Sequence, residues 1–313
     1  MELNILGTAS QLPTETRNHG GYFLRWEDQA ILFDPGEGIQ RQFILGGLSV
    51  PSVRIICLSH FHGDHCLGLP GVIQRLALAR VPYPIMLIYP QEGEAYLTKL
   101  LSCSEFQNDL ILQKIPIVKE GVIAQAGELH IEAVALQHRI PTYGYRLVKP
   151  KGYRFDKEKL QALEISGKSV GILQKNGKLQ TPKGIVTQDH VSKEVPPQIF
   201  AYVADTAHGN HLKTLMKDAD LVLCETTYLK DDAELALQYK HLTTKYAATA
   251  AKENEVKYLI ATHFSERYGD TNVIEKELRD IFPRSYAAHD FLRYTLEFKT
   301  GKLTIETIRK NDE

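Results

Sequence analysis

The sequence is a chain of 313 residues, 43% of them hydrophobic, which is typical of a globular protein with one large core or two smaller ones. Its formal net charge is −1 and its isoelectric point is about 6.9, which excludes a global positive field for nucleic acid or an anionic membrane. Any binding of that kind requires a local patch of positive charge.

Four cysteines and the N-terminal segment bear on where the protein works. Cys57, Cys66, Cys103 and Cys224 are scattered and lack CxxC spacing, which favours reduced thiols over a disulfide framework. The opening MELNILGTAS has no basic region followed by a long apolar one, and no run approaches about 18 apolar residues. We therefore expect a cytoplasmic protein without export or membrane insertion.

Short apolar runs rich in β-branched residues alternate with helical patterns along the chain. Strands are predicted at 3–6, 21–26, 30–34, 54–59, 84–90, 130–136, 199–205, 220–225 and 257–263. Helices are predicted at 68–80, 91–101, 208–218, 232–252 and 272–281, where apolar residues recur every three or four positions. The alternation predicts an α/β fold, and the strand-rich first and last thirds suit two βα halves.

The segment 149–183 differs from the rest of the chain in composition. It holds nine Lys or Arg against three Asp or Glu, a local net charge of +6, and it contains few apolar residues. We predict an insert outside the main core that carries a positive patch. A solvated loop is the alternative reading.

Residues that can bind metal follow four of the predicted strands. His60, His62, Asp64 and His65 form HxHxDH directly after one strand, and three more such residues end later strands: His138, Asp205 and His263. Ligand sites gather at strand ends in α/β folds. Taken alone, His138 or His263 could be an ordinary core or surface histidine, and Asp205 could cap a helix. Three imidazoles and a carboxylate within one turn have no such ordinary reading.

Seven candidate ligands are too many for one tetrahedral ion and suit two ions that share a carboxylate. Mixed imidazole and carboxylate donors predict Zn²⁺, with Mn²⁺ and Fe²⁺ also compatible. Two ions about 4 Å apart clamp the attacking and leaving oxygens in phosphoryl displacement.

The HxHxDH motif resembles the signature of the metallo-β-lactamase superfamily, whose fold is a four-layered αβ/βα sandwich. Further segments are similar, in order, to the ribonuclease Z family of tRNA 3′-processing endonucleases: LGTASQLPTETRN, FDPGEGIQRQ, SHFHGDHCLGLPG, CETTY, KHLTTKYAA, THFSERY and AAHDF. The resemblance spans nearly the whole chain. It implies one metallo-β-lactamase-like domain over 1–313, a homodimer, and a projecting, flexible basic arm at 149–183 that grips tRNA.

The resemblance also implies roles for individual residues. It assigns one metal to His60, His62 and His138, the other to Asp64, His65 and His263, and a bridging position to Asp205. It makes Asp64 the general base and His241 the proton donor to the leaving 3′-oxygen, with Glu225 orienting the imidazole and favouring its protonated form. We assign tRNA binding to four residues of the arm and the C-terminal third: Lys168, Lys175, Lys178 and Arg267.

The predicted function is a zinc endoribonuclease that cleaves the 3′ trailer from precursor tRNA, leaving a 3′-hydroxyl on the tRNA and a 5′-phosphate on the trailer. One alternative is a small-molecule hydrolase of the same superfamily, such as a phosphodiesterase, arylsulfatase or lactamase. Another is an RNA-binding relative without catalysis. The basic insert and His241 favour the nuclease over the first, and the complete ligand set favours it over the second.

Overall fold

The computed structural model describes residues 1–107 and 109–309, which form two compact units. Unit 1 combines Met1–Val148 with the chain from Ile199 onward, and unit 2 is Lys149–Gln198. Within the described ranges, no helix has the length and apolar character needed to cross a membrane.

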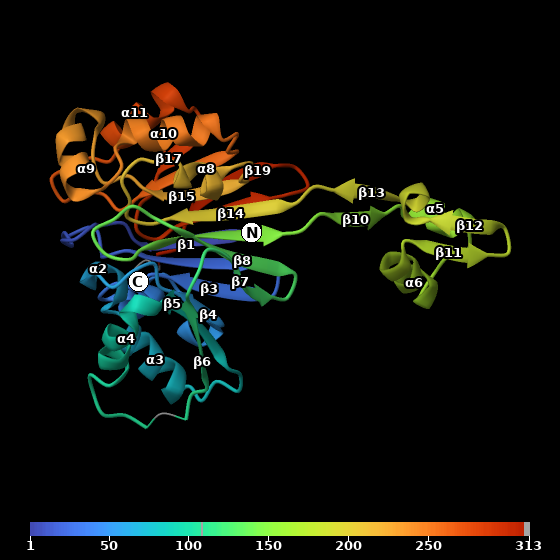
Figure 1. The fold of residues 1–313 in the computed structure, drawn as a ribbon, viewed down its shortest axis with the longest axis horizontal. Helices are drawn as coiled ribbons and strands as arrows, with labels where there is room; N and C mark the ends of the chain where they lie inside the picture. The colour runs from blue at the N-terminus through green and yellow to red at the C-terminus, as the bar shows by residue number, and fades with distance from the viewer. Residues whose placement is uncertain (108, 310–313) are drawn as a thin grey trace. The chain divides into compact units, whose positions relative to one another are not determined.

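The first sheet of unit 1 has eight strands, antiparallel at one side and parallel at the other (Figure 1). Pairing is antiparallel from β19 to β3 and parallel from β3 to β6. The spatial order is β19 (Lys302–Thr307), β18 (Leu292–Glu297), β1 (Glu2–Gly7), β2 (Gly21–Trp26), β3 (Gln29–Phe33), β4 (Ile55–Cys57), β5 (Ile85–Pro90) and β6 (Leu112–Ile117).

The second sheet has seven strands, and its parallel part carries the ends that matter for the site. Strands β14 to β17 run parallel, whereas β7, β8 and β9 are antiparallel. The order is β17 (Ser285–Ala287), β16 (Tyr258–Thr262), β15 (Leu221–Glu225), β14 (Gln198–Val203), β9 (Tyr143–Lys149), β8 (Leu129–Ala135) and β7 (Gly121–Ala126).

Alternation along the first sheet separates two hydrophobic cores. In β2, Tyr22 and Leu24 face the second sheet, where Tyr22 packs on Tyr202 with ring centroids 5.4 Å apart. Between them, Phe23 faces the opposite side and packs on Phe43 at 5.0 Å. This side is covered by α1 (Ile39–Leu45), α3 (Leu69–Leu78) and α4 (Glu94–Leu101). Period-two patterning therefore buries both faces of this sheet.

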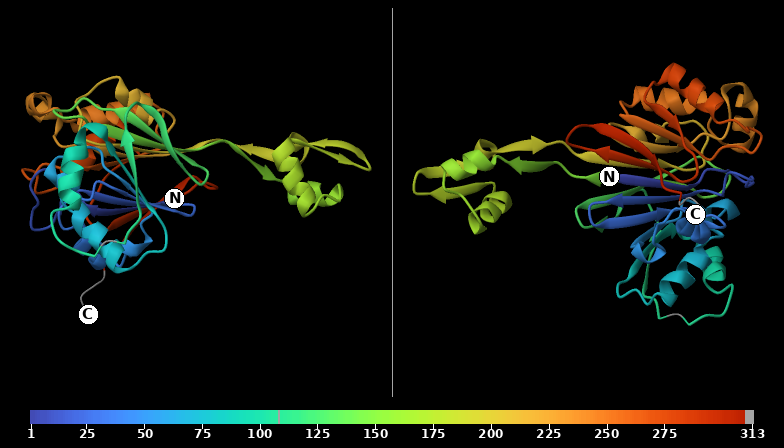
Figure 2. Two further views of the ribbon diagram at one scale, coloured as in Figure 1. Left: turned by 60° about the horizontal axis from the view of Figure 1, so that its bottom comes forward. Right: turned by 180° about the vertical axis from the view of Figure 1, so that it is seen from behind.

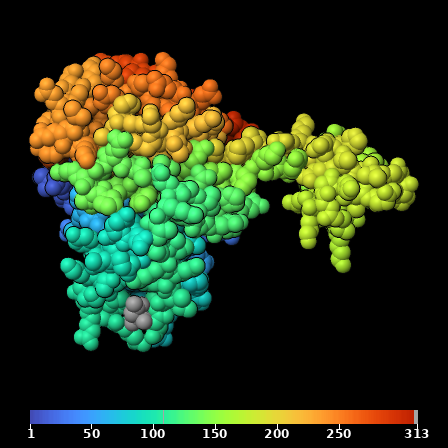
Figure 3. Space-filling view, in the orientation of Figure 1, coloured from blue at the N-terminus to red at the C-terminus, as the bar shows by residue number. Residues whose placement is uncertain are grey.

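Helices also cover the outer face of the second sheet, completing four layers in the order helix, sheet, sheet, helix. These helices are α8 (His211–Met216), α10 (Thr244–Glu253) and α11 (Asn272–Ile281), all packed into the larger core. Figure 1 shows the helices that follow β4 and those that follow β14 on opposite sides of unit 1, and in the space-filling view of Figure 3 the same segments appear in cyan and in yellow to orange on opposite sides. The predicted α/β class and four-layered αβ/βα sandwich are confirmed.

One predicted helix, 232–252, is wrong in a way that shapes the site. The structure has α9 (Ala233–Tyr239) and α10 in its place, because Lys240 takes a left-handed φ of 57° that ends α9. Thr243 then caps α10, its hydroxyl accepting a hydrogen bond from the Tyr246 amide. The break projects His241 between the two helices.

Other elements were not predicted from the apolar runs. Strands β6, β7 and β9 belong to this group, as do β17 to β19 and helix α1. The alternative of Asp205 as a helix cap does not hold, because α8 begins at His211 with Asn210 at the N-cap position. The remaining short elements of unit 1 are α2 (Gly63–Cys66), η1 (Val50–Ser52), η2 (Gln91–Gly93) and η3 (Lys230–Asp232).

Unit 2 has secondary structure and a small core of its own (Figure 2). Its strands form two pairs, β10 (Gly152–Phe155) with β13 (Ser192–Val195) and β11 (Lys178–Thr181) with β12 (Gly184–Thr187). Its helices are α5 (Lys157–Ala162), α6 (Lys168–Asn176) and α7 (Gln188–Val191). The core contains Leu160, Ile165, Leu173, Val186 and Val191. The unit therefore includes 184–198 in addition to the basic segment 149–183.

Candidate metal centre and active site

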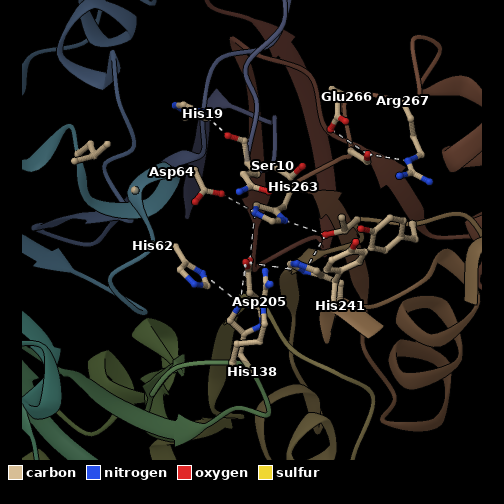
Figure 4. A pocket seen from close by; sticks show the side chains of 18 residues that line it. Ser10, His19, His62, Asp64, His138, Asp205, His241, His263, Glu266 and Arg267 are labelled. Atoms are coloured by element: carbon tan, nitrogen blue, oxygen red, sulfur yellow. Dashed lines mark hydrogen bonds and ion pairs between the residues drawn. The ribbon is translucent and has the colours of Figure 1, made fainter. Parts of the chain in front are cut away.

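Seven side chains from the ends of four strands meet at one place. Figure 4 shows the five of them that line the cleft: His62, Asp64, His138, Asp205 and His263. His60 and His62 follow β4, and α2 then carries Asp64 and His65. The other three follow β8, β14 and β16: His138, Asp205 and His263. One group with ligand atoms within 4.8 Å of one another contains His60, His62, His138 and Asp205, and another contains Asp64, His65 and His263.

Asp205 lies between the two groups and turns one carboxylate oxygen to each. Oδ2 lies 3.7 Å from His60 Nε2 and 3.8 Å from His138 Nε2. Oδ1 lies 3.4 Å from His65 Nε2 and 3.3 Å from His263 Nε2. Oδ1 is buried and has no hydrogen-bond partner among the residues that the structure describes. A buried carboxylate oxygen without a partner is costly, and a metal ion held by the group that contains His65 and His263 would satisfy it.

Hydrogen bonds at the far ring nitrogens determine which nitrogen four of the histidines, His60, His65, His138 and His263, turn to the centre. Nδ1 of His138 donates to the Lys240 carbonyl at 3.1 Å, and Nδ1 of His65 donates to the Asp34 carboxylate at 3.0 Å. Because these oxygens only accept, the neutral form of each ring carries its lone pair on Nε2. His60 and His263 have the same arrangement, with Nδ1 against Ser59 Oγ at 2.9 Å and Thr227 Oγ1 at 2.9 Å.

The electrostatics of His60, His138 and Asp205 suit metal ligands. At His65, burial lowers the pKa, but attraction to Asp205 and Asp64 outweighs it and the net pKa is raised, so a metal ion would take the place of a proton on this ring. Burial lowers the pKa of His60 well below its usual value and that of His138 to about 4, so both rings are neutral near pH 7. Burial raises the pKa of Asp205, but the neighbouring histidines outweigh it and the net pKa lies well below the usual value. Neutral imidazoles and an ionised carboxylate are the forms that bind metal.

Asp34 is the main site residue for which sequence reasoning assigned no role. Its buried carboxylate accepts hydrogen bonds from the Ser59 amide at 2.6 Å and the Tyr202 hydroxyl at 2.6 Å, besides the bond from His65. Asp34 holds a positive φ of 43°, and ligand His263 holds one of 61°. The FDPG segment after β3 marks the position of Asp34 in the sequence, but its partners come from β14, helix α2 and the loop between β4 and α2.

His241 lies beside the metal groups and is held by Glu225. Its Nδ1 is 3.2 Å from Glu225 Oε1 and 4.0 Å from Asp205 Oδ2. Burial lowers the pKa of His241, but attraction to Glu225 and Asp205 outweighs it, and the net pKa is raised. Glu225 is itself fixed by the amides of Thr206 at 3.1 Å and Leu242 at 2.8 Å. A protonated imidazole at this place can donate a proton.

The metal groups and His241 are reached from solvent through an open cleft of about 470 Å³. His62, Asp64, His138, Asp205, His241 and His263 line it, whereas His60 and His65 are buried beneath. Arg267 also lines the cleft and is held by Ser265 Oγ at 3.2 Å and Asp232 at 3.8 Å. The other predicted binding residues, Lys168, Lys175 and Lys178, are exposed on unit 2.

The fold and this ligand set define a metal-dependent hydrolase of the metallo-β-lactamase class, and comparisons with known proteins agree. The family model described as the metallo-beta-lactamase superfamily matches residues 21–102. Ribonuclease Z of Salinispora arenicola is 46% identical over 281 residues, covering 90% of this chain and 91% of that protein. Ribonuclease Z of Chlamydia trachomatis serovar L2 is 40% identical over 292 residues, covering 93% and 96%.

Solved structures share the fold at lower identity. Human tRNase Z, short form, superimposes with a TM-score of 0.66 at 23% identity, covering 95% of this chain and all of that one. YhfI of Bacillus subtilis, a metallo-beta-lactamase fold protein, gives a TM-score of 0.67 at 16% identity, covering 97% and 98%. The chain belongs to the ribonuclease Z family. This membership confirms the predicted enzyme class, a metal-dependent nuclease.

Proposed function

We propose that this protein removes the 3′ trailer from precursor tRNA by zinc-dependent hydrolysis, giving a tRNA 3′-hydroxyl and a trailer 5′-phosphate. Family membership supports the RNA substrate. The observation that carries the chemistry is Asp205, whose two oxygens face two separate groups of imidazoles. This is the donor arrangement expected for two ions that act on one phosphate.

The residues divide into two metal-binding sets. His60, His62 and His138 would hold one ion, and Asp64, His65 and His263 would hold the other, with Asp205 contributing to both sets. The bound ions supply Lewis acidity that activates water and stabilises negative charge on the phosphate. Zinc is proposed because the donors are imidazole nitrogens and carboxylate oxygens, which Mn²⁺ or Fe²⁺ also accept.

The chain's own groups move the protons. Asp64 lines the open cleft, and its Oδ2 lies 3.4 Å from His263 Nε2. We assign it as the general base for the attacking water, the role that the resemblance to ribonuclease Z implies. His241 is the general acid that protonates the leaving 3′-oxygen, and Glu225 holds its ring and favours the protonated form. Hydrolysis by water leaves the substrate's 2′-hydroxyl outside the reaction.

Substrate recognition is assigned to two regions. The segment 149–183 acts as an arm that binds tRNA, and its exposed Lys168, Lys175 and Lys178 meet backbone phosphates. Arg267 binds substrate within the cleft. The rest of the chain serves as one catalytic domain of the metallo-β-lactamase type.

We further propose that the protein works in the cytoplasm as a homodimer. The cytoplasm is supported by the four cysteines, all of which are free thiols. The homodimer is supported by the resemblance to ribonuclease Z. Sedimentation of the zinc-loaded protein at several concentrations tests the dimer, and a single species of monomer mass would contradict it.

The test of function uses a tRNA transcript with a 3′ trailer and a matched hairpin with the same acceptor stem and trailer but no T arm. Trailer release from the full precursor should be faster by 10-fold or more, roughly the value of one lost ion-paired contact. Equal rates on both RNAs would argue against tRNA recognition. Hydrolysis of small phosphodiesters without RNA cleavage would instead support the small-molecule hydrolase.

A further inference from the structure

Two arginines line the cleft, and they differ in what holds them. Arg267 lies over the ring of Tyr228 at 5.3 Å and is paired with Asp232. Arg139 lies over the ring of Tyr239 at 5.6 Å, and no carboxylate among the described residues forms an ion pair with it. Arg139 is exposed, and both it and Tyr239 line the cleft beside the metal groups. Its charge is therefore available to a ligand that enters there.

The backbone around Arg139 is fixed by contacts to the same helix break that positions His241. His138 Nδ1 donates to the Lys240 carbonyl at 3.1 Å, and Lys240 Nζ donates to the His138 carbonyl at 3.1 Å. Tyr239 is the last residue of α9, directly before Lys240. The chain neighbours of Arg139 and Tyr239, which are His138 and Lys240, are therefore joined by two hydrogen bonds. The Arg139 guanidinium is held over the Tyr239 ring by a cation–π contact.

The position of Arg139 in the chain places its charge near a phosphate next to the scissile one. It directly follows His138, whose Nε2 faces the metal groups, and consecutive Cα atoms are about 3.8 Å apart. The metal groups receive the scissile phosphate, so a charge beside them meets the next phosphate along the strand. Guanidinium groups suit this task because they bind phosphate oxygens in a bidentate manner.

We propose that Arg139, supported by the ring of Tyr239, forms a subsite for a backbone phosphate adjacent to the scissile phosphate of the RNA. This subsite rests on the proposed RNA cleavage and adds a binding group that no sequence motif marked. Figure 4 places His138, the residue before Arg139, on the opposite side of Asp205 from Arg267. The two arginines therefore meet different parts of the bound strand.

The test compares Arg139→Ala with Arg139→Lys and with a matched control, Arg284→Ala. Arg284 is also exposed and also lies 5.6 Å from a tyrosine ring, that of Tyr258, but it does not line the cleft. Arg139→Ala should raise KM for precursor tRNA about 10-fold with little change in kcat, since one charge-assisted contact is lost. The slope of log kcat/KM against log salt should flatten by about one. Arg139→Lys should retain most of that slope, and Arg284→Ala should leave both quantities unchanged.

A second arm identifies the phosphate itself. Precursors are made with one neutral methylphosphonate, placed on either side of the scissile phosphate. Wild type should lose about 10-fold in kcat/KM with one of the two, and Arg139→Ala should lose nothing further with that same substrate. Additive losses with both substrates would overturn the subsite, and so would a rise in KM for unmodified precursor in Arg284→Ala equal to that in Arg139→Ala. Both results would leave RNA cleavage by wild type intact. Absence of precursor cleavage by wild type would overturn the proposed function and the subsite together.

Discussion

Asp34 accepts a hydrogen bond from Nδ1 of His65 at 3.0 Å, which directs Nε2 of that ring toward the metal groups. Every partner of this carboxylate is a donor, including the Ser59 amide and the Tyr202 hydroxyl. An asparagine here would set its NH₂ group against at least one of these donors. We expect Asp34→Asn to lower zinc affinity 10- to 100-fold, the usual effect of losing a group that orients a ligand.

The measurement for Asp34 is zinc affinity by competition with a chromophoric chelator. Asp218→Asn is the matched control, because Asp218 also has a positive φ, 56°, but is exposed. Unchanged zinc affinity in Asp34→Asn would contradict the role of this carboxylate in orienting His65.

Metal content follows from the seven ligands. Elemental analysis of fully loaded protein should give roughly two zinc ions per chain, and chelation should abolish cleavage. His65→Ala and His138→Ala should each retain about one ion, since these histidines belong to different groups. A single ion in fully active wild type would contradict the two-metal account.

His241→Ala should keep both metals and lose about 10²- to 10⁴-fold in kcat, the range for general acid catalysis.

Glu225→Gln should change the pH dependence of kcat. Glu225 raises the pKa of His241, so its neutralisation lowers that pKa, and the acid loses its proton at lower pH. The alkaline fall in kcat should therefore move to lower pH. Glu253→Gln, an exposed residue of α10, serves as the control. An alkaline limb that stays in place would remove Glu225 from this role.

Asp290 gives a pH dependence of stability apart from the metal ligands. Burial raises its pKa to about 6, against the hydrogen bonds it accepts from Thr8 and the Asn18 amide. Between about pH 4 and 6 the folded carboxyl keeps a proton that the unfolded one has lost, so its contribution to stability falls as pH rises. The free energy of unfolding, measured with urea, should be compared between wild type and Asp290→Asn. The value for wild type minus that for Asp290→Asn should fall by at most about 3 kcal/mol as the pH rises across that window. A difference that is constant from pH 4 to 7 would contradict this assignment.

The triple variant with Lys168, Lys175 and Lys178 changed to Ala should bind precursor tRNA with a weaker dependence on salt. The slope of log K, the binding constant, against log salt should flatten by about three if each lysine meets one phosphate. Three exposed lysines of unit 1, Lys119, Lys217 and Lys299, provide a control of equal charge. Equal slopes in the two triple variants would show that unit 2 has no special part in binding.

The features that could be predicted from the sequence are those marked by local patterns of residues. Apolar runs marked nine strands close to their observed bounds, and reactive side chains after four of them indicated where ligands would meet. This works because buried strands in an α/β fold are continuous apolar segments, and their carboxyl ends gather on one side of the sheet.

What the sequence did not predict depends on contacts between distant segments. Asp34 and Thr227 were given no role because their partners, His65 and His263, lie 31 and 36 residues away. The break at Lys240 was missed because a left-handed lysine interrupts a sequence whose helical periodicity continues on both sides. The core of unit 2 was missed because its apolar residues are separated by charged ones.

The most direct measurement of the account maps both product ends after zinc-loaded protein cleaves one 3′-extended tRNA, with Asp64→Ala as the inactive control. Attack by water with His241 protonating the 3′-oxygen predicts a tRNA that ends in a 3′-hydroxyl and a trailer that carries a 5′-phosphate. The tRNA should then accept a ligated or polymerised nucleotide directly, and the trailer should be degraded by a 5′-phosphate-dependent exonuclease. A 2′,3′-cyclic phosphate on the tRNA with a 5′-hydroxyl on the trailer would show attack by the 2′-hydroxyl and contradict the account.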